Sequence, residues 1–472
     1  MHRALTLLTI LAGCGVKRNP EACDRDEQCS NGYVCNLDTN RCEMPPDGST
    51  RCTTNDQCPV VTPICGVDQT CRSCKLDDEC ASGVCHPEGL CEAVERVLYV
   101  SPTGISAGTC SPTSPCDLAF ARSQLSLERA TIRLANGIYT LASDFTITGS
   151  ATRATIVGGQ SAVIQRSNLG AALHVTLGAT LTLRGFSASR GVACSDAKLS
   201  IERLAFDSAS ETRPWISAAG CTFSITDSEL NNSSAEGIIT GDGNGATPAT
   251  TIRGTKIRNS VGNGIRVTGG ACSITTSLVT GGMQMGVAAD SVKLSIERSI
   301  VSHNRAGGIS LMGSGSSYDI TNNFVFRNGN DANGAFGGLR LAPTSSGNNK
   351  VRHNTITFND SQVDANPLYA GGLYCTNGTA ANNLIFANYA GNTTQPNAQF
   401  AGNCDTTGSI IDNGGTQMHF VSPIAAPFDY HLANVASPAI DVAISSDVSV
   451  DFDGQARPNG QPDVGADELY PF

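Results

Sequence analysis

One short phrase recurs four times between residues 294 and 388 and decides the fold. The copies read SIVSHN (299–304), NFVFRN (323–328), NTITFN (354–359) and NLIFAN (383–388). Each opens on a small polar residue, passes through an apolar step and closes on Asn five positions later, and successive copies lie 24, 31 and 29 residues apart. A repeat of this length is typical of a solenoid that stacks one supersecondary unit per repeat.

The repeats favour β-strands over helices. They are rich in Ile, Val, Thr and Phe, with frequent Asn and Gly, and they lack a long 3.6-residue periodicity. A second phrase follows three of the copies, as GGISL (307–311), GGLRL (337–341) and GGLYC (371–375). Each coil is therefore expected to hold at least two strands.

The first position of the phrase continues backwards along the chain with Ser or Thr in place of Asn. Ser277, Thr255 and Ser228 precede Ser299 at intervals of 22, 22 and 27 residues. Stacked coils place equivalent residues about 4.8 Å apart. Side chains of these types in an inward turn can satisfy backbone groups and one another along the stack. The alternative is that they are solvent-facing turn residues, since Asn is a common turn former.

Composition bounds the partners. The chain has 472 residues, of which 50 are Gly and 15% are charged, and its length suits one long solenoid with smaller pieces. The formal net charge of −11 gives no global reason to expect binding to nucleic acid or to an anionic membrane surface.

The first residues have the pattern of a secretory signal. A short charged start and the apolar run from Ala4 to Leu11 precede LAGC at 11–14, which resembles the bacterial lipobox. That resemblance implies a signal peptide at 1–13, acylation of Cys14 and a lipidated linker at 14–22. We therefore expect a bacterial cell-envelope protein, lipid-anchored at the outer membrane or cell surface; simple secretion with an incidental Cys14 is the alternative.

Three four-cysteine modules are expected over residues 23–94. An even number of cysteines at repeated spacing behind a secretion signal indicates disulfides, with three pairings open in each module. Zinc is the competing interpretation, although only Cys71 and Cys74 are spaced closely enough for metal ligands, and the acidic clusters of the modules leave calcium conceivable. The modules comprise Cys23, Cys29, Cys35 and Cys42; Cys52, Cys58, Cys65 and Cys71; and Cys74, Cys80, Cys85 and Cys91.

The spacing of these modules resembles small cysteine-rich repeats in surface proteins of predatory and soil bacteria, and distantly the N-terminal domain of Dickkopf proteins. The resemblance implies binding or spacing rather than catalysis.

Residues 97–427 carry a second resemblance. YVSPTG (99–104), the loop with Cys110 and Cys116, the amphipathic stretch 117–127 and the NGIY turn (136–139) resemble the opening of right-handed parallel β-helix proteins of the pectate-lyase-like superfamily. This implies an all-β solenoid, with about eleven coils counted to Ile410 and a length of roughly 50 Å. Cys110 is expected to bridge to Cys116. One-coil spacing also allows Cys194 to bridge to Cys221 and Cys375 to Cys404, which leaves Cys272 as a buried thiol.

Members of that superfamily often cleave acidic polysaccharides. The superfamily's hydrolase motifs are absent, so no catalytic residue is assigned, while a lyase is harder to exclude because its residues are scattered. Basic residues of the ladder coils form columns that can hold an anionic sugar chain. The candidate ligand face comprises His303, Arg327, Arg352 and His353.

Residues 428–472 resemble the terminal segment of bacterial surface β-helix proteins, with SPAID (437–441), DFDG (451–454) and DVGADE (463–468). Their spaced acids around Arg457 are interpreted as a salt-bridged cap, with calcium as the alternative. The expected function is structural or in recognition, including polysaccharide binding, with no required cofactor or resident metal and with the lipid anchor as the membrane contact. The alternative is a polysaccharide lyase or glycoside hydrolase acting on acidic glycans.

Overall fold

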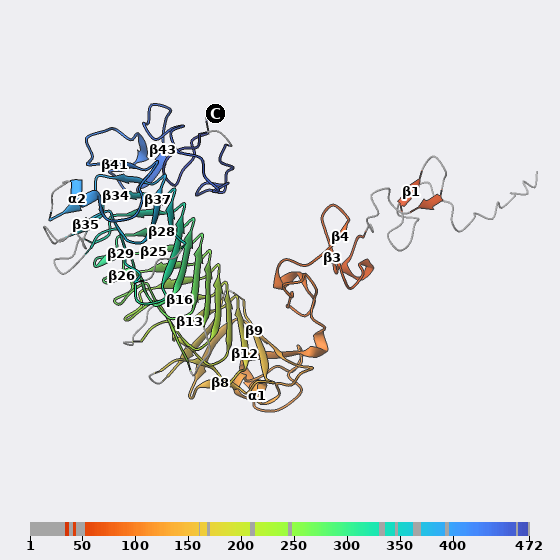
Figure 1. Ribbon diagram of the computed structural model, residues 1–472. Helices are drawn as coiled ribbons and strands as arrows, with labels where there is room; N and C mark the ends of the chain where they lie inside the picture. The colour runs from red at the N-terminus through yellow and green to blue at the C-terminus, as the bar shows by residue number, and fades with distance from the viewer. Residues whose placement is uncertain are drawn as a thin grey trace, which may run out of the picture. The chain divides into compact units, whose positions relative to one another are not determined.

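The computed structural model describes residues 34–36, 41–43, 52–159, 161–167, 170–207, 213–243, 248–329, 336–344, 348–361, 370–391, 396–458 and 461–470. The chain divides into two compact units, residues 1–97 and residues 98–472 (Figure 1). Each unit is described by itself below.

The first unit has very little regular structure. Two antiparallel ribbons are formed by β1 (Val34–Asn36) with β2 (Arg41–Glu43) and by β3 (Ile64–Cys65) with β4 (Cys71–Arg72). Short 3₁₀ turns lie at η2 (Asn55–Gln57), η3 (Asp77–Glu79) and η4 (Val94–Arg96). A domain with so little core depends on covalent cross-links.

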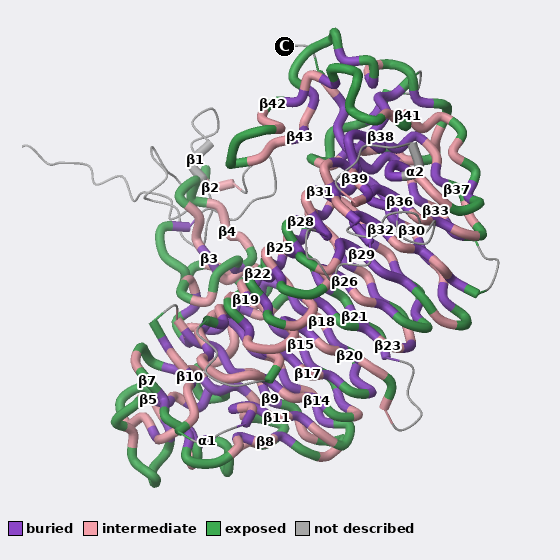
Figure 2. The backbone as a smooth tube through the Cα atoms, turned by 90° about the vertical axis from the view of Figure 1, so that its left-hand side faces the viewer, coloured by how far each residue is buried: buried purple, intermediate pink, exposed green. Residues whose placement is uncertain are grey.

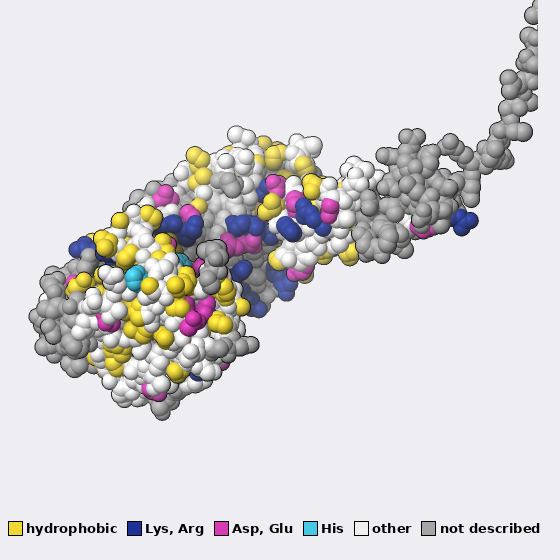
Figure 3. Space-filling view, turned by 90° about the horizontal axis from the view of Figure 1, so that it is seen from above, with side chains coloured by type: hydrophobic (Ala, Val, Ile, Leu, Met, Phe, Trp, Pro, Cys, Tyr) yellow, Lys and Arg dark blue, Asp and Glu magenta, His cyan; other side chains and the backbone are white. Residues whose placement is uncertain are grey.

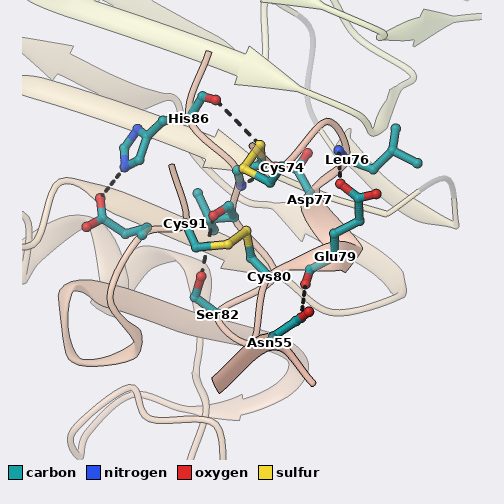
Figure 4. Close-up of a disulfide and its surroundings, with 12 residues drawn as sticks. Asn55, Cys74, Leu76, Asp77, Glu79, Cys80, Ser82, His86 and Cys91 are labelled. Atoms are coloured by element: carbon teal, nitrogen blue, oxygen red, sulfur yellow. Dashed lines mark hydrogen bonds and ion pairs between the residues drawn. A yellow bond between two sulfur atoms is a disulfide. The ribbon is translucent and has the colours of Figure 1, made fainter. Parts of the chain in front are cut away.

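The disulfides of this unit join the first cysteine of a module to the third and the second to the fourth. They are Cys52–Cys65, Cys58–Cys71, Cys74–Cys85 and Cys80–Cys91. The expected disulfides are present in these two modules, one of the three open pairings is selected, and the zinc interpretation is wrong there because the sulfurs are oxidised. Figure 4 shows Cys80–Cys91, with the Asn55 amide donating to the carbonyl of Glu79 nearby. Cys14, Cys23, Cys29 and the side chain of Cys35 lie outside the described residues.

The second unit is a parallel β-solenoid with three long sheets of 12, 11 and 12 strands, as the sequence predicted. The first sheet consists of β7 (Gly137–Leu141), β10 (Ala162–Arg166), β13 (Ser187–Ala188), β16 (Ala205–Phe206), β19 (Glu229–Asn231), β22 (Lys256–Arg258), β25 (Leu278–Thr280), β28 (Ile300–Ser302), β31 (Phe324–Phe326), β34 (Thr355–Thr357), β38 (Leu384–Phe386) and β41 (Ile410–Asp412).

The second sheet consists of β8 (Phe145–Thr148), β11 (Leu173–Thr176), β14 (Val192–Ser195), β17 (Ile216–Ala219), β20 (Ile238–Gly241), β23 (Ile265–Thr268), β26 (Met285–Asp290), β29 (Gly307–Met312), β32 (Leu339–Leu341), β36 (Leu373–Cys375) and β40 (Phe400–Gly402). The third consists of β5 (Val97–Ile105), β6 (Thr131–Leu134), β9 (Arg153–Val157), β12 (Thr180–Arg184), β15 (Lys198–Glu202), β18 (Thr222–Thr226), β21 (Ala249–Arg253), β24 (Ala271–Thr275), β27 (Lys293–Glu297), β30 (Ser317–Thr321), β33 (Asn349–Arg352) and β37 (Gly378–Ala381). Two short parallel strands, β35 (Asp360–Ser361) and β39 (Tyr389–Ala390), pair outside these sheets.

Alternation along each strand fills the solenoid with apolar side chains, which Figure 2 shows as buried positions repeating from coil to coil. In the third sheet, Leu181 aligns with Leu199 and Leu183 with Ile201, and all four are buried. Two disulfides, Cys194–Cys221 and Cys375–Cys404, join cysteines one coil apart, and Cys272 is buried and free. The core is thus one continuous apolar column with a few covalent staples.

The repeated Asn residues lie inside the solenoid, so the solvent-facing alternative is wrong. Asn354 is fully buried; its Oδ1 accepts the N–H of Asn323 at 2.9 Å, and its Nδ2 donates to the carbonyl of Ile320 at 2.8 Å and to Oδ1 of Asn383 at 2.9 Å. One ladder contains Ser228, Thr255, Ser277, Ser299, Asn323, Asn354 and Asn383, and the other contains Asn304, Asn328, Asn359 and Asn388. The ladders satisfy turn N–H groups that would otherwise be buried without partners.

A residue with positive φ precedes each ladder residue of the four repeated phrases and forms a corner on either side of the first sheet. These corner residues have φ between 50° and 58°. They are Arg298, Asn322, His353 and Asn382 at one corner and His303, Arg327, Phe358 and Ala387 at the other. The left-handed conformation turns the chain so that the next side chain points inward and the corner side chain points outward.

At the start of the solenoid, α1 (Leu118–Ser123) packs Leu118 and Ala121 into the core. Asp117 caps it by accepting the N–H of Phe120 at 2.6 Å, and the Cys110–Cys116 disulfide closes the loop before it. The expected helix over 117–127 is therefore present but shorter, because the chain turns at Gln124. A second short helix, α2 (Pro396–Gln399), lies near the other end.

The C-terminal segment, defined here as residues 418–470, lies on the outer side of the first sheet. Its hairpin of β42 (Phe420–Ser422) and β43 (Asp429–Leu432) packs Phe420 and Tyr430 against Phe326 and Phe386. The segment begins about ten residues before the expected boundary at 428, and it covers a side of the solenoid. Figure 3 shows hydrophobic side chains gathered on the end of the unit where it lies, and Ile424 is 83% exposed.

Arg457 is buried at the centre of this segment. Its guanidinium bonds Glu468 at 2.9 Å, the carbonyls of Asp463 and Gly465, and the Asn322 amide oxygen of the solenoid. Burial raises the pKa of Glu468 to about 7. The salt-bridged interpretation of this segment therefore agrees with the structure at Arg457.

Candidate functional site

Two of the four residues expected to form the ligand face are held by aromatic side chains of the C-terminal segment. The Arg327 guanidinium lies 3.9 Å from the ring centroid of Phe428 and bonds the Tyr430 hydroxyl at 3.1 Å and the carbonyl of Pro423 at 3.0 Å. His303 stacks at 5.4 Å on Phe428. Burial and the Arg327 charge lower the pKa of His303.

The other two residues lie at the opposite corner of the first sheet. Arg352 bonds Asp319 at 3.0 Å and also pairs with Asp447 of the C-terminal segment. His353 has no exposed surface, and its Nε2 lies 3.1 Å from the Asn382 amide nitrogen. Burial, assisted by the charges of Arg457 and Arg352, lowers the pKa of His353 to about 3, so its imidazole is neutral near pH 7.

The expectation of an exposed ligand face at His303, Arg327, Arg352 and His353 is therefore contradicted by the structure. The columns are real, but they are the two corner columns, and the C-terminal segment lies against both. A polysaccharide cannot reach His353 in this arrangement. We refer to these four residues as the covered strip.

A different basic site opens on the second sheet, where a cleft of about 160 Å³ crosses three successive coils. His174 of β11, Ala193 of β14 and Ser217 of β17 form one outward column on its floor. The arginine cleft is lined by Gly170, Ala171, His174, Ser189, Arg190, Gly191, Val192, Ala193, Arg213, Pro214, Trp215 and Ser217. This volume corresponds to about five waters, the scale of one sugar unit.

The walls of the arginine cleft are fixed by contacts with the core and with Asp144. Trp215 is buried, packs on Phe206 at 5.5 Å and donates its indole N–H to the carbonyl of Asn231 at 3.0 Å, which anchors the chain beside Arg213. Asp144 pairs with Arg166 at 2.6 Å and with His174 at 3.3 Å. Arg213 itself is exposed to solvent.

Sequence reasoning missed this cleft because its residues do not repeat. His174 is an isolated histidine in the sequence, and Arg190 and Arg213 lie in connections rather than at ladder positions. The available signal was coil length: Val192 and Ile216 are paired neighbours 24 residues apart, whereas Leu173 and Val192 are only 19 apart. Arg213, which belongs to the longer coil, lines one wall of the cleft.

Comparisons with known proteins place the second unit in a fold. Residues 216–422 match the family model described as "Right handed beta helix region". The solved structure described as "Crystal structure of pectate lyase Pel9A" superimposes with a TM-score of 0.54 at 14% identity, covering 84% of this chain and 99% of that one. The second unit is therefore a right-handed parallel β-helix, and at this identity the likeness establishes the fold alone.

More remote matches include a PL6 family alginate lyase, AlyGC, with a TM-score of 0.40 at 12% identity, covering 79% of this chain and 59% of that one. The Streptococcus pneumoniae surface adhesin PfbA matches with a TM-score of 0.36 at 9% identity, covering 66% and 93%. These likenesses are too weak to support a conclusion about function. No protein with a curated description matches the sequence. In the described parts of the chain, no helix is long and apolar enough to cross a bilayer.

Proposed function

We propose that the β-helix is a recognition rod of the bacterial cell envelope and that its arginine cleft binds one unit of an anionic polysaccharide. The observation that carries this proposal is the convergence of Arg190, Arg213 and His174 on a cleft that crosses three coils. The covered strip is occupied by the chain's own C-terminal segment, whereas the cleft stays open to a polymer.

The chemistry of the cleft suits carboxylate or sulfate groups. Guanidinium groups bind such anions through paired hydrogen bonds, and two of them on one wall favour a charged sugar over a neutral one. His174 and Ser217 on the floor supply a ring nitrogen and a hydroxyl for sugar hydroxyls.

The outward column of the second sheet favours a chain that runs along the rod. Coils stack at about 4.8 Å, and the column that starts at His174 continues through Ala193, Ser217 and Ile239 to Arg266. A polymer bound at the cleft can continue over these neighbouring strands with its backbone parallel to the stack.

The test is calorimetric titration of the full chain with polygalacturonate, with neutral dextran as the comparison ligand. We expect binding to polygalacturonate only, and a loss of at least tenfold in Arg213→Ala. Arg266→Ala is the matched control, because Arg266 lies on the same sheet outside the cleft, 52% exposed and 3.8 Å from Glu236. Equal binding by both variants, or no binding by the wild type, would contradict the proposal.

A polysaccharide lyase is the second candidate function, and the contact between His174 and Asp144 favours it. A carboxylate 3.3 Å from a histidine can orient the ring as a base beside arginines that neutralise a uronate carboxylate. A protein of the same fold, Pel9A, is a pectate lyase. The wild type would release an unsaturated product absorbing in the ultraviolet, and His174→Ala would not; absence of product from pectate, alginate and chondroitin leaves binding as the function.

The envelope location rests on residues 1–22, which lie outside the described part of the chain. We propose that Cys14 is acylated after removal of residues 1–13 and holds the protein on a membrane. In the native host, processing is expected to be globomycin-sensitive, and Cys14→Ala is expected to leave the membrane fraction. Unchanged fractionation of Cys14→Ala would exclude a lipid anchor.

A further inference from the structure

We propose that the C-terminal segment contains a binding site for a divalent transition-metal ion, with Zn²⁺ as its best fit, formed by His431, Asp453 and Asp467. Each of the three side chains offers one ligand atom, and these atoms all lie within 4.8 Å of one another. The site is separate from the arginine cleft and from the bonds of Arg457.

Histidine Nε2 is the key atom of this site. Nδ1 of His431 lies 2.6 Å from Oδ1 of Asp429, which identifies Nδ1 as the protonated nitrogen. Nε2 is buried, lies 3.3 Å from Oδ2 of Asp453 and makes no hydrogen bond. In a neutral ring its lone pair therefore points towards carboxylates, an arrangement that a bound cation would stabilise.

Asp429 has the role that orienting carboxylates have in histidine metal sites. A carboxylate on the outer ring nitrogen fixes the tautomer and makes the other nitrogen a better ligand. Phe324 and Phe452 pack on the ring of His431 with centroid distances of 4.8 and 5.7 Å. The ring plane is therefore set before any ion binds.

The two carboxylates are also held in place. Oδ2 of Asp467, a residue only 6% exposed, accepts the N–H of Leu432 at 2.7 Å. Asp453 lies in a turn fixed by the N–H of Phe452, which bonds the carbonyl of Ala466 at 2.8 Å, and by the Arg298 guanidinium, which bonds the carbonyl of Phe452 at 2.8 Å. The three ligands thus come from β43, from the turn at 451–454 and from the tail at 463–468.

Ligand type and spacing select the ion. Tetrahedral zinc with bonds of about 2.0–2.2 Å has ligand atoms about 3.3 Å apart, which is the separation of Nε2 of His431 and Oδ2 of Asp453. Calcium prefers oxygen ligands in larger number. Asp453 is partly exposed, with 44% of its side chain accessible, so water can complete the coordination.

An ion pair of protonated His431 with its carboxylates is the alternative, and charge favours it. Burial opposes the imidazolium, but Asp429, Asp467 and Asp453 together raise the pKa of His431. The like charges of Asp451 and Asp453 add to burial in raising the pKa of Asp467. A divalent cation would neutralise more of this negative charge than one imidazolium does, so the two accounts differ in whether metal binds.

The other close groups of potential ligands among the described residues do not compete. They are Cys52 with Cys58 and Cys65, and Cys74 with Cys80 and Cys85, and all six sulfurs are in disulfides. Zinc binding by the oxidised chain therefore reports on the histidine site.

The test uses the full chain with intact disulfides, stripped with a chelator and titrated with ZnCl₂ and separately with CaCl₂. We expect one Zn²⁺ to bind with micromolar affinity, and Co²⁺ in its place to give visible absorption. Asp453→Asn should weaken Zn²⁺ binding at least tenfold and Asp429→Asn about tenfold. His86→Gln is the matched control, because His86 pairs with Glu92 at 3.0 Å without a third ligand.

Asp453 is partly exposed, so its variant tests the site even where His431→Gln disturbs folding. Absence of Zn²⁺ binding, unchanged affinity in Asp453→Asn, or preference for Ca²⁺ over Zn²⁺ would overturn the proposal. A zinc-dependent rise in melting temperature in the wild type and His86→Gln, but not in Asp453→Asn, would support it.

Discussion

The covered strip and the arginine cleft are both basic, but they use their charges differently. In the strip, Arg327 is engaged by Phe428 and Tyr430, and His353 is buried and neutral. In the cleft, Arg213 is exposed beside a floor of outward strand residues. The comparison teaches that a column of basic residues repeating with the coil can mark a corner used for intramolecular packing, whereas a binding cleft forms where the coil length changes.

The largest expected effect comes from Arg457→Ala, which removes the link between the C-terminal segment and the solenoid. The substitution leaves Glu468 buried without its partner and breaks the bond to Asn322. We expect a loss of about 3–5 kcal/mol in the free energy of unfolding the segment. Hydrogen exchange should show faster exchange at residues 418–470 and at the strip, with the cleft unaffected; a uniform change along the solenoid would contradict this account.

The strip should also make stability depend on pH. The folded state holds the pKa of His353 at about 3, below the ordinary 6.5, so the unfolded chain binds an extra proton between these values. This contribution is complete above pH 6.5 and is lost as pH falls towards 3, by about 2 kcal/mol between pH 6.5 and pH 5.

Urea unfolding of the wild type and His353→Gln at both pH values isolates this contribution. The difference in unfolding free energy between the two proteins should shift by that amount on acidification. A difference that is independent of pH would show that His353 is not held neutral by burial.

A smaller effect is expected from Arg327→Ala. It removes the cation–π contact with Phe428 and the bond to Tyr430, which together contribute about 1–2 kcal/mol to stability. Polysaccharide binding should be unchanged, because Arg327 lies outside the cleft. Arg213→Ala should show the reverse, with binding lost and urea stability retained; weakened binding in Arg327→Ala would make the strip a ligand site after all.

The sequence predicted the architecture well because the repeat reports on local requirements that recur in every coil. Asn354 has to be an amide, since it accepts an N–H from one coil and donates to the next, and the same need applies to Asn328 and Asn359. The one-coil disulfides followed from the same logic.

The sites were not predictable in the same way. The burial of His353 depends on Asp447, Ile444 and Arg457, which lie some 90 to 105 residues further along the chain, and a column pattern does not show what packs on it. The zinc ligands His431, Asp453 and Asp467 come from three segments that only the fold brings together. Long-range packing thus decided which basic and acidic residues remain available to ligands.

The most direct test of the central claim is modification of the intact protein with diethyl pyrocarbonate, with labelled histidines identified by mass spectrometry. The reagent attacks neutral imidazoles, and His353 is neutral near pH 7, so its protection can come only from burial. We predict rapid labelling of His174, whose side chain is 27% exposed, and none of His353 until the protein unfolds. Labelling of His353 at the rate of His174 would contradict the claim that the C-terminal segment covers the strip.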